Sequence, residues 1–304
     1  MEANSKLVMF AVNENHLVAF LIFVVSFVGL LANATVALFS STLGSLQNSF
    51  GRLSASQAIG EGILTGLFCF FYVPTVFFSL TSWQEVSTYC GVVLLFCYDV
   101  CIYCHLFISL NRLTAICFPI RYDQIFSIRT TTVYIVIAYV LAASSSFYVH
   151  YLNHCEFAMT GLGWIFMFET NPICGDLSLK FNGFKDILVV SIIAVVDVIT
   201  LLAIHLTRKA ILQGVVFVTE LFSYFVLPNY FENRWLLFFS TTFAWNIVHS
   251  ADPLIIILLN KEFRKLISKP FSKLSCSCIS FKPNFGRITS YSGETQPRAT
   301  NTPA

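Results

Sequence analysis

The sequence contains seven runs of mainly apolar residues, and each is close to the length that a helix needs to cross a membrane. A spanning helix takes about 20 such residues. Hydrocarbon offers no partner to backbone N–H and C=O groups, so each run is expected to be helical. The candidate spans are residues 17–40, 52–79, 88–113, 130–152, 184–206, 210–228 and 235–259, of which the sixth is short. They predict an all-α bundle of seven transmembrane helices.

The composition excludes several classes of protein. Hydrophobic residues make up 56% of the chain and charged residues 11%, whereas soluble domains have about 25% charged residues. No loop carries a nucleophile–base pair, so we predict that the protein is not an enzyme and needs no cofactor. A net charge of +2 gives no reason to expect a nucleic-acid partner. Because a thiol inside an apolar run behaves as a small hydrophobe, we assign no metal site to Cys69, Cys97, Cys101 and Cys104.

The positive charges are distributed unequally between the two sides of the predicted bundle. If the amino terminus is extracellular, fourteen of the eighteen Lys and Arg residues lie on the inner side and four on the outer side. Cytoplasmic segments carry an excess of these residues, which favours this orientation. We therefore predict a multi-pass protein of the plasma membrane. Its extracellular amino terminus would be residues 1–16, its transmembrane domain 17–260 and its disordered cytoplasmic tail 271–304.

Polar side chains inside the first two spans are expected to contact neighbouring helices. Gly29 and Asn33 lie one turn apart on one helix face, where a small residue permits close approach and a buried amide needs a partner. Gln57 and Glu61 have the same spacing in the second span. These polar residues are either general packing contacts or parts of a functional network. For Glu61, a buried and hydrogen-bonded carboxyl with no further role is equally compatible with the sequence.

Arg112 lies where the third span ends, between Asn111 and Leu113. The long stem of an arginine at a helix end can extend to the lipid headgroups, so a membrane-edge anchor is one interpretation. Pro119 forces a turn shortly after Arg112, because proline is excluded from helix interiors. Tyr122 follows at the next turn. The spacing makes this segment the first candidate for a functional site.

The seventh span and the segment after it carry further candidates. Asp252 and Pro253 place an acid beside a helix-breaking residue near the inner end of the span. Residues 261–270 alternate basic and apolar side chains at helical spacing, which predicts a short amphipathic helix on the inner leaflet. Cys276 and Cys278 then follow as candidate palmitoylation sites.

Several of these stretches resemble a known family. The segment 110–116 with Pro119 and Tyr122 resembles the end of the third helix in rhodopsin-like G-protein-coupled receptors. Together with residues 212–217, 220–225 and 241–245, it is similar to the nematode chemosensory receptors of serpentine receptor class x. The resemblance implies a seven-helix receptor that detects a small environmental molecule and signals through a heterotrimeric G protein. It assigns coupling and switching to Asn111, Arg112, Leu113, Pro119, Tyr122, Asp252 and Pro253.

The resemblance also implies a disulfide and a type of ligand. Receptors of this kind join a cysteine at the outer end of the third helix to the second outer loop, which would pair Cys90 with Cys174, and Cys155 is the other loop cysteine. Amine receptors carry an aspartate eighteen residues before the arginine, where this chain has Leu94. A small, weakly polar ligand in an aromatic and apolar outer cavity is therefore expected.

Two alternatives to a signalling receptor remain open from the sequence. A seven-helix transporter or channel could use the acids inside the spans as a proton path, although transporters tend to show internal repeats and this chain shows none. A receptor relative that does not signal is the other alternative, because only about four residues separate the fifth and sixth apolar runs. The family has a longer third inner loop.

Overall fold

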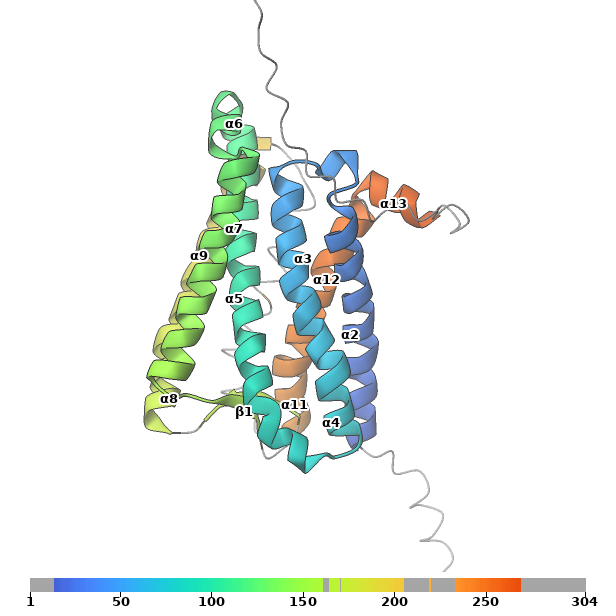
Figure 1. The fold of residues 1–304 in the computed structure, drawn as a ribbon, viewed down its shortest axis with the longest axis vertical. Coiled ribbons are helices and arrows are strands. Elements are labelled where there is room, and N and C mark those ends of the chain that lie inside the picture. The colour runs from blue at the N-terminus through green and yellow to red at the C-terminus, as the bar shows by residue number, and fades with distance from the viewer. Residues whose placement is uncertain (1–13, 161–163, 170, 205–218, 220–232, 269–304) are drawn as a thin grey trace, which may run out of the picture. The chain divides into compact units, whose positions relative to one another are not determined.

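A computed structural model of the chain describes residues 14–160, 164–169, 171–204, 219 and 233–268. The chain divides into two compact units, Met1–Leu266 and Ile267–Ala304, and the fold described here is that of the first unit. Its described residues form a bundle of long helices with one short β-hairpin (Figure 1). The prediction of an all-α bundle is confirmed.

Five helical runs among the described residues are long and apolar enough to cross a membrane, and they coincide with predicted spans one to four and seven. Their boundaries differ from the predicted ones by a few residues because polar residues at the helix ends extend the runs. The first three runs are α2 (Glu14–Phe39), α3 (Ser49–Leu67) continued by η3 (Phe68–Tyr72) and α4 (Val73–Phe77), and α5 (Thr81–Cys117). The last two are α7 (Ile128–Ser146) continued by η5 (Phe147–Leu152), and α11 (Arg234–Phe238) continued by η9 (Phe239–Phe243) and α12 (Ala244–Leu259).

The fifth predicted span coincides with α9 (Phe184–Ile204), which packs against α5. The helical run begins earlier than predicted, with α8 (Pro172–Leu177) and η6 (Ser178–Gly183) inside the second outer loop. The sixth predicted span and the short link before it lie outside the described residues, apart from residue 219. The remaining short helical elements are η2 (Gly44–Leu46), η4 (Pro119–Arg121), α6 (Tyr122–Ile125) and α13 (Lys261–Ser268).

Proline residues shape three of the helices. A π-helical turn, η3, lies directly before Pro74, because proline has no N–H and its ring clashes with the preceding turn. The residue before a proline disfavours helical geometry, and α5 ends at Cys117, just before Pro119. Arg112 therefore lies inside the last turns of α5, not at its end as the sequence suggested. Pro253 lies inside α12, and the helix continues past this proline to Leu259.

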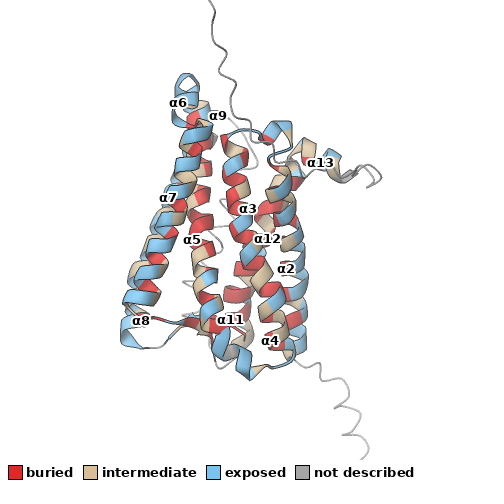
Figure 2. Cartoon of the chain, viewed as in Figure 1, coloured by how far each residue is buried: buried red, intermediate tan, exposed pale blue. Residues whose placement is uncertain are grey.

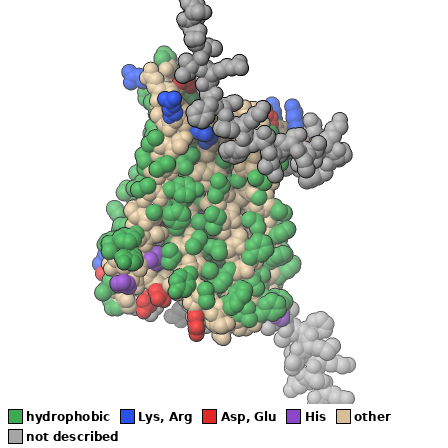
Figure 3. All heavy atoms as spheres, viewed as in Figure 1, with side chains coloured by type: hydrophobic (Ala, Val, Ile, Leu, Met, Phe, Trp, Pro, Cys, Tyr) green, Lys and Arg blue, Asp and Glu red, His purple; other side chains and the backbone are tan. Residues whose placement is uncertain are grey.

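The described bundle has an apolar surface and polar groups in its interior, as a lipid environment requires. Large hydrophobic side chains such as Phe20 and Leu38 are more than half exposed, at 62% and 69%. The exposed faces of the outer helices and the buried face of α5 are visible in Figure 2. In Figure 3, hydrophobic side chains cover the middle of the visible face, and Lys and Arg side chains lie mainly near the end where α6 lies.

The predicted second outer loop, which lies between η5 and α8, folds over one end of the bundle as a β-hairpin (Figure 1). Its strands β1 (Phe157–Met159) and β2 (Phe166–Phe168) are antiparallel, with Ala158 paired to Met167. Phe157, Phe166 and the intervening Trp164 are almost completely buried. These strands were not predicted from the sequence. These three aromatic side chains anchor the described strands, since they pack in the main hydrophobic core with residues of the helices.

Helix α5 approaches the hairpin very closely at Gly91. A Cβ atom at this position would lie 1.7 Å from the carbonyl oxygen of Phe157, so only glycine permits the contact. Two hydrogen bonds hold the hairpin nearby. The Met159 N–H donates to Ser87 Oγ at 3.0 Å, and the Tyr72 hydroxyl donates to the Trp164 carbonyl at 2.6 Å.

The predicted disulfide between Cys90 and Cys174 is wrong. Cys174 is bridged to Cys155, and Cys90 is a free thiol. Cys155 lies just before β1 and Cys174 just after β2, so the antiparallel hairpin brings the two together. Because the two loop cysteines bridge each other, neither is left to pair with Cys90.

Candidate functional site

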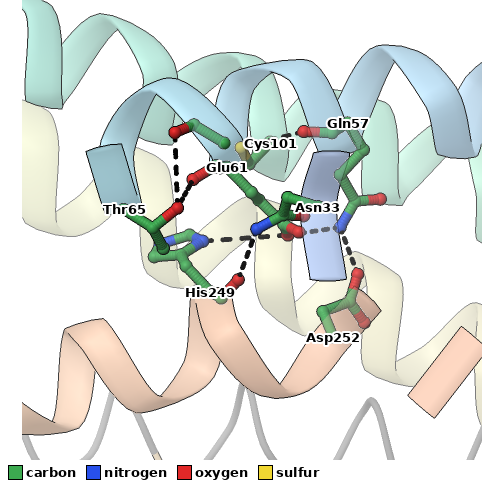
Figure 4. A network of polar contacts seen from close by, with 8 residues as sticks. Asn33, Gln57, Glu61, Thr65, Cys101, His249 and Asp252 are labelled. Carbon is green, nitrogen blue, oxygen red and sulfur yellow. Dashed lines mark hydrogen bonds and ion pairs between the residues drawn. The ribbon is translucent and has the colours of Figure 1, made fainter. Parts of the chain in front are cut away.

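A network of buried polar side chains joins four helices near the middle of the bundle (Figure 4). The Gln57 amide Nε2 is its centre: it donates to Asp252 Oδ2 at 2.6 Å and to Glu61 Oε1 at 3.0 Å. These three side chains are at most 2% exposed. A buried acid next to a proline can accept from backbone donors that the proline frees. Asp252 instead accepts from a glutamine on α3, which ties the second helix to the seventh.

The first helix joins the same network through the face that the sequence indicated. Asn33 Nδ2 donates to the His249 carbonyl oxygen at 3.1 Å. One turn away, a Cβ atom at Gly29 would lie 2.1 Å from Ser250 Oγ, so the small residue permits close contact between α2 and α12. Ser250 Oγ in turn donates to the Val25 carbonyl oxygen at 3.1 Å. Asn33 therefore acts across the helix interface, as expected for a buried amide.

Three further side chains from three helices meet beside Gln57. His249 Nδ1 of α12 lies 3.8 Å from Glu61 Oε1 of α3. The Cys101 thiol of α5 donates weakly to the Gln57 carbonyl oxygen at 3.8 Å. The Thr65 hydroxyl donates to the Glu61 carbonyl oxygen at 2.8 Å. His249 and Cys101 are completely buried. The sequence did not predict that they meet Glu61, because about 190 residues separate Glu61 from His249, about 150 separate Cys101 from His249 and about 40 separate Glu61 from Cys101.

Aromatic side chains connect this network to the hairpin. Trp245 of α12 is the centre, with its ring centroid 6.2 Å from that of Phe157 and 5.6 Å from that of Phe68. Tyr98 contacts Trp245 at 5.9 Å and His249 at 5.9 Å, both edge to face. Such pairs prefer edge-to-face geometry because the ring edge is positive and the face negative. A displacement of the hairpin therefore acts directly on the rings next to His249.

A buried ion pair lies between α5 and α9 in the outer half of the bundle. Lys185 Nζ donates to both carboxylate oxygens of Asp99, at 2.6 and 2.8 Å, and to Ser145 Oγ at 3.1 Å. Asp186 lies 3.5 Å from the same ammonium group. The side chains of Lys185 and Asp99 are 17% and 7% exposed. Lys185 and Asp186 lie at the start of the fifth predicted span, and both line a small cavity that His150 also lines.

Two of the predicted switch residues, Asn111 and Tyr122, contact each other at the end of the bundle where α6 lies (Figure 1), whereas Asp252 belongs to the network around Gln57. Asn111 Nδ2 donates to the Tyr122 hydroxyl at 3.1 Å, which ties the end of α5 to the turn after Pro119. The Arg112 guanidinium lies over the Phe50 ring, 5.6 Å from its centroid. Leu113 is half-buried and Pro119 is exposed.

Two acidic residues of other helices, Asp197 of α9 and Asp252 of α12, carry charges opposite in sign to that of Arg112. The candidate lipidation sites Cys276 and Cys278 lie outside the described residues.

Comparisons with known proteins agree on one family. The model of the serpentine type seven-transmembrane chemoreceptors of class Srx, a family of G-protein-coupled receptors, matches residues 23–211 and 204–260. Serpentine receptor class X 45 of Caenorhabditis elegans is 30% identical, over 89% of this chain and 86% of that protein. Serpentine receptor class X-43 of the same organism is 27% identical, over 76% of this chain and 79% of that protein.

Proposed function

Because this chain belongs to the serpentine Srx family of seven-transmembrane chemoreceptors, we propose that it detects a small environmental molecule and signals through a heterotrimeric G protein. The observation that carries the proposal is the run of buried contacts from the hairpin to the polar network around Gln57. It passes from Phe157 through Trp245 to His249 of α12, beside which Gln57 binds Asp252 of the same helix. A receptor needs such a connection, because its ligand and its G protein bind at opposite ends of the bundle.

The ligand site is proposed beside the ion pair of Lys185 and Asp99. The cavity there has a volume of about 20 Å³, which is the space of about one water molecule. A ligand therefore enters only when the outer parts of α5 and α9 separate, and a ligand that favours this state shifts the population towards it. Its polar group would contact Ser145, and its apolar part would contact Tyr98.

The switch is proposed at Arg112. Asn111 has no charge with which to neutralise its neighbour and bonds to Tyr122 instead. The guanidinium is always charged, so its restraint depends on Asp197 of α9 and Asp252 of α12. Movement of either helix changes that restraint and frees the arginine to face an incoming G protein. Asp99 and Lys185 link α5 to the same helix α9, which supports a common motion at both ends.

The orientation in the membrane and the domain limits belong to the same proposal. The basic residues near α6 support an inner location for that end of the bundle, with residues 1–16 outside and the tail 271–304 inside (Figure 3). Helix α13 would lie on the inner leaflet, and Cys276 and Cys278 would carry palmitoyl groups. Epitope tags on intact cells test the orientation: only an amino-terminal tag should be stained without permeabilisation, and staining of a carboxy-terminal tag would contradict it.

The receptor function is tested by a screen of small molecules on cells that express the protein with a G-protein activation reporter. We expect at least one weakly polar compound to raise the reporter in a dose-dependent manner. The same compounds are then added to liposomes that contain the purified protein. Flux of solute or protons across these liposomes would favour a transporter, and a compound that raises the thermal stability of the purified protein without activating any G protein would favour a non-signalling relative. Either result contradicts the proposal.

A further inference from the structure

Three side chains that bind metal ions in other proteins converge in the middle of the bundle. They are Glu61 of α3, Cys101 of α5 and His249 of α12, and one ligand atom from each lies within 4.8 Å of the other two. Their exposed fractions are 1%, 0% and 0%. Figure 4 shows the Glu61, Cys101 and His249 side chains in one small region between the helices. The cluster is not needed for the contacts that hold α2, α3 and α12 together through Gln57 and Asn33.

The His249 ring has unused hydrogen-bonding capacity beside these groups. Neither of its nitrogen atoms has a hydrogen-bond partner among the described residues, although the side chain is completely buried. Buried polar groups in native proteins are almost always satisfied, so each exception requires an explanation. The ring nitrogen Nδ1 already points towards the Glu61 carboxylate, at 3.8 Å. An ion held between the two would satisfy both.

The types of donor select the ion. A thiolate, an imidazole and a carboxylate are a common ligand set for Zn²⁺, with three protein ligands and one open position. Na⁺, Mg²⁺ and Ca²⁺ prefer oxygen donors, and a thiolate disfavours them. We propose that Glu61, Cys101 and His249 bind one Zn²⁺ ion. On binding, the Cys101 thiol loses its proton to solvent and its sulfur binds the metal, so that one thiolate and one carboxylate balance the two positive charges.

The geometry is close to what zinc requires. Ligand atoms about 2.0–2.3 Å from a tetrahedral zinc ion lie roughly 3.3–3.6 Å apart, so the Glu61 and His249 atoms are already near the required separation. The other separations, which are within 4.8 Å, must shorten by roughly an ångström, which side-chain rotation supplies. Gln57 Nε2 donates to Glu61 Oε1 and fixes the carboxylate. Such support from outside the ligand set is usual at metal sites.

The site is tested with purified full-length protein, stripped of metal and titrated with Co²⁺ and Zn²⁺. Bound Co²⁺ reports a thiolate ligand through a near-ultraviolet charge-transfer band. We expect one equivalent to bind, and Cys101→Ser to remove the band and weaken Zn²⁺ binding by about 100-fold or more. Cys104→Ser is the matched control, because Cys104 is equally buried on the same helix but its thiol faces Ser56, at 3.6 Å. Equal binding by wild type and Cys101→Ser would overturn the proposal.

A measurement on the unaltered protein covers the case in which Cys101→Ser does not fold. X-ray absorption of the zinc-loaded wild type should show one sulfur at about 2.3 Å and nitrogen or oxygen atoms at about 2.0–2.1 Å. A shell with several sulfur atoms would assign the ion to other cysteines of the chain, and a shell with none would exclude Cys101. Either result, or no Zn²⁺ binding at all, rejects the site. These measurements do not depend on signalling.

Discussion

Replacement of Lys185 by methionine tests the buried ion pair between α5 and α9. The substitution keeps the length of the side chain and removes its charge, so Asp99 loses the partner that binds both of its oxygens at 2.6 and 2.8 Å. Asp186, 3.5 Å from the ammonium group, also loses its nearest cation. Removal of one partner from a buried pair costs about 3–5 kcal/mol, because the remaining charge stays in a low-dielectric interior.

This cost is large enough to measure as a change in the unfolding temperature. A domain of this size loses about 2–4 °C per kcal/mol, so Lys185→Met should lower the midpoint by roughly 6–20 °C. The assay is thermal unfolding of the purified protein, followed by a dye that reacts with exposed thiols. The double variant Lys185→Met with Asp99→Asn removes both charges and should recover at least half of the loss.

A surface pair on the same helical run provides the control. Lys180 and Asp176 form an ion pair at 2.8 Å, but their side chains are 76% and 66% exposed. Exposed pairs contribute about 0–1 kcal/mol, so Lys180→Met should lower the midpoint by less than about 4 °C. The reasoning is refuted if Lys185→Met is no more destabilising than Lys180→Met, or if the double variant is no more stable than the single one.

Three further predictions concern the hairpin, its disulfide and helix α13. Gly91→Ala should displace the hairpin and lower the unfolding midpoint by several degrees, because the added Cβ would lie 1.7 Å from a backbone oxygen. Gly175→Ala is the control and should be neutral, because no atom lies within 4 Å of its Cβ; equal effects of the two variants would contradict the contact. Cys155→Ala should cost about 3 kcal/mol by opening a loop of 19 residues, and Cys90→Ala should cost clearly less; the reverse order would restore the pairing expected from the sequence. The Ser45 N–H of the η2 segment donates to the Glu262 carboxylate and lowers its pKa below the usual 4.5. The stabilising effect of the Glu262 carboxylate on α13 is therefore complete above pH 4.5 and is lost as the pH falls through the lowered pKa. Protection of α13 from hydrogen exchange should fall in the same pH range, and Glu262→Gln should abolish this pH dependence.

The sequence predicted the parts of the fold that depend on local properties. A run of about 20 apolar residues has one stable structure in lipid, which is why α2, α5 and α7 lie where expected. Pro74 and Pro119 act on neighbouring backbone only, so their effects on the helices could also be predicted. The contact face of Gly29 and Asn33 followed from helical periodicity within a single span.

The contacts that failed or were missed depend on how distant elements meet. The sequence left Cys155 or Cys174 as the partner of Cys90, and the pairing of the two loop cysteines with each other depends on a hairpin whose three-residue strands give almost no signal in sequence. Lys185 lies at the end of an apolar run, where it is expected to reach water. Only the rotation of α9 against α5 decides that it turns inward to Asp99. Charge alone indicates that a residue needs a partner, not where the partner lies.

The cluster of Glu61, Cys101 and His249 was missed for a related reason. Metal-site motifs are recognised by short spacings between ligands, and these three positions belong to three different helices. Each has an adequate explanation when considered alone: a buried carboxyl, a thiol in an apolar run and a polar residue in the seventh span. Their combination becomes visible only when α3, α5 and α12 are packed together.

The most direct test of the account is the effect of Arg112→Ala on G-protein activation by a compound that activates the wild type. Arg121→Ala is the control, because Arg121 is an exposed arginine in the inner turn that follows. Activation is measured as energy transfer between labelled receptor and G protein, in cells with matched surface expression of each variant. The account predicts that Arg112→Ala abolishes activation while Arg121→Ala retains most of it. Full activation by Arg112→Ala would contradict the proposed switch.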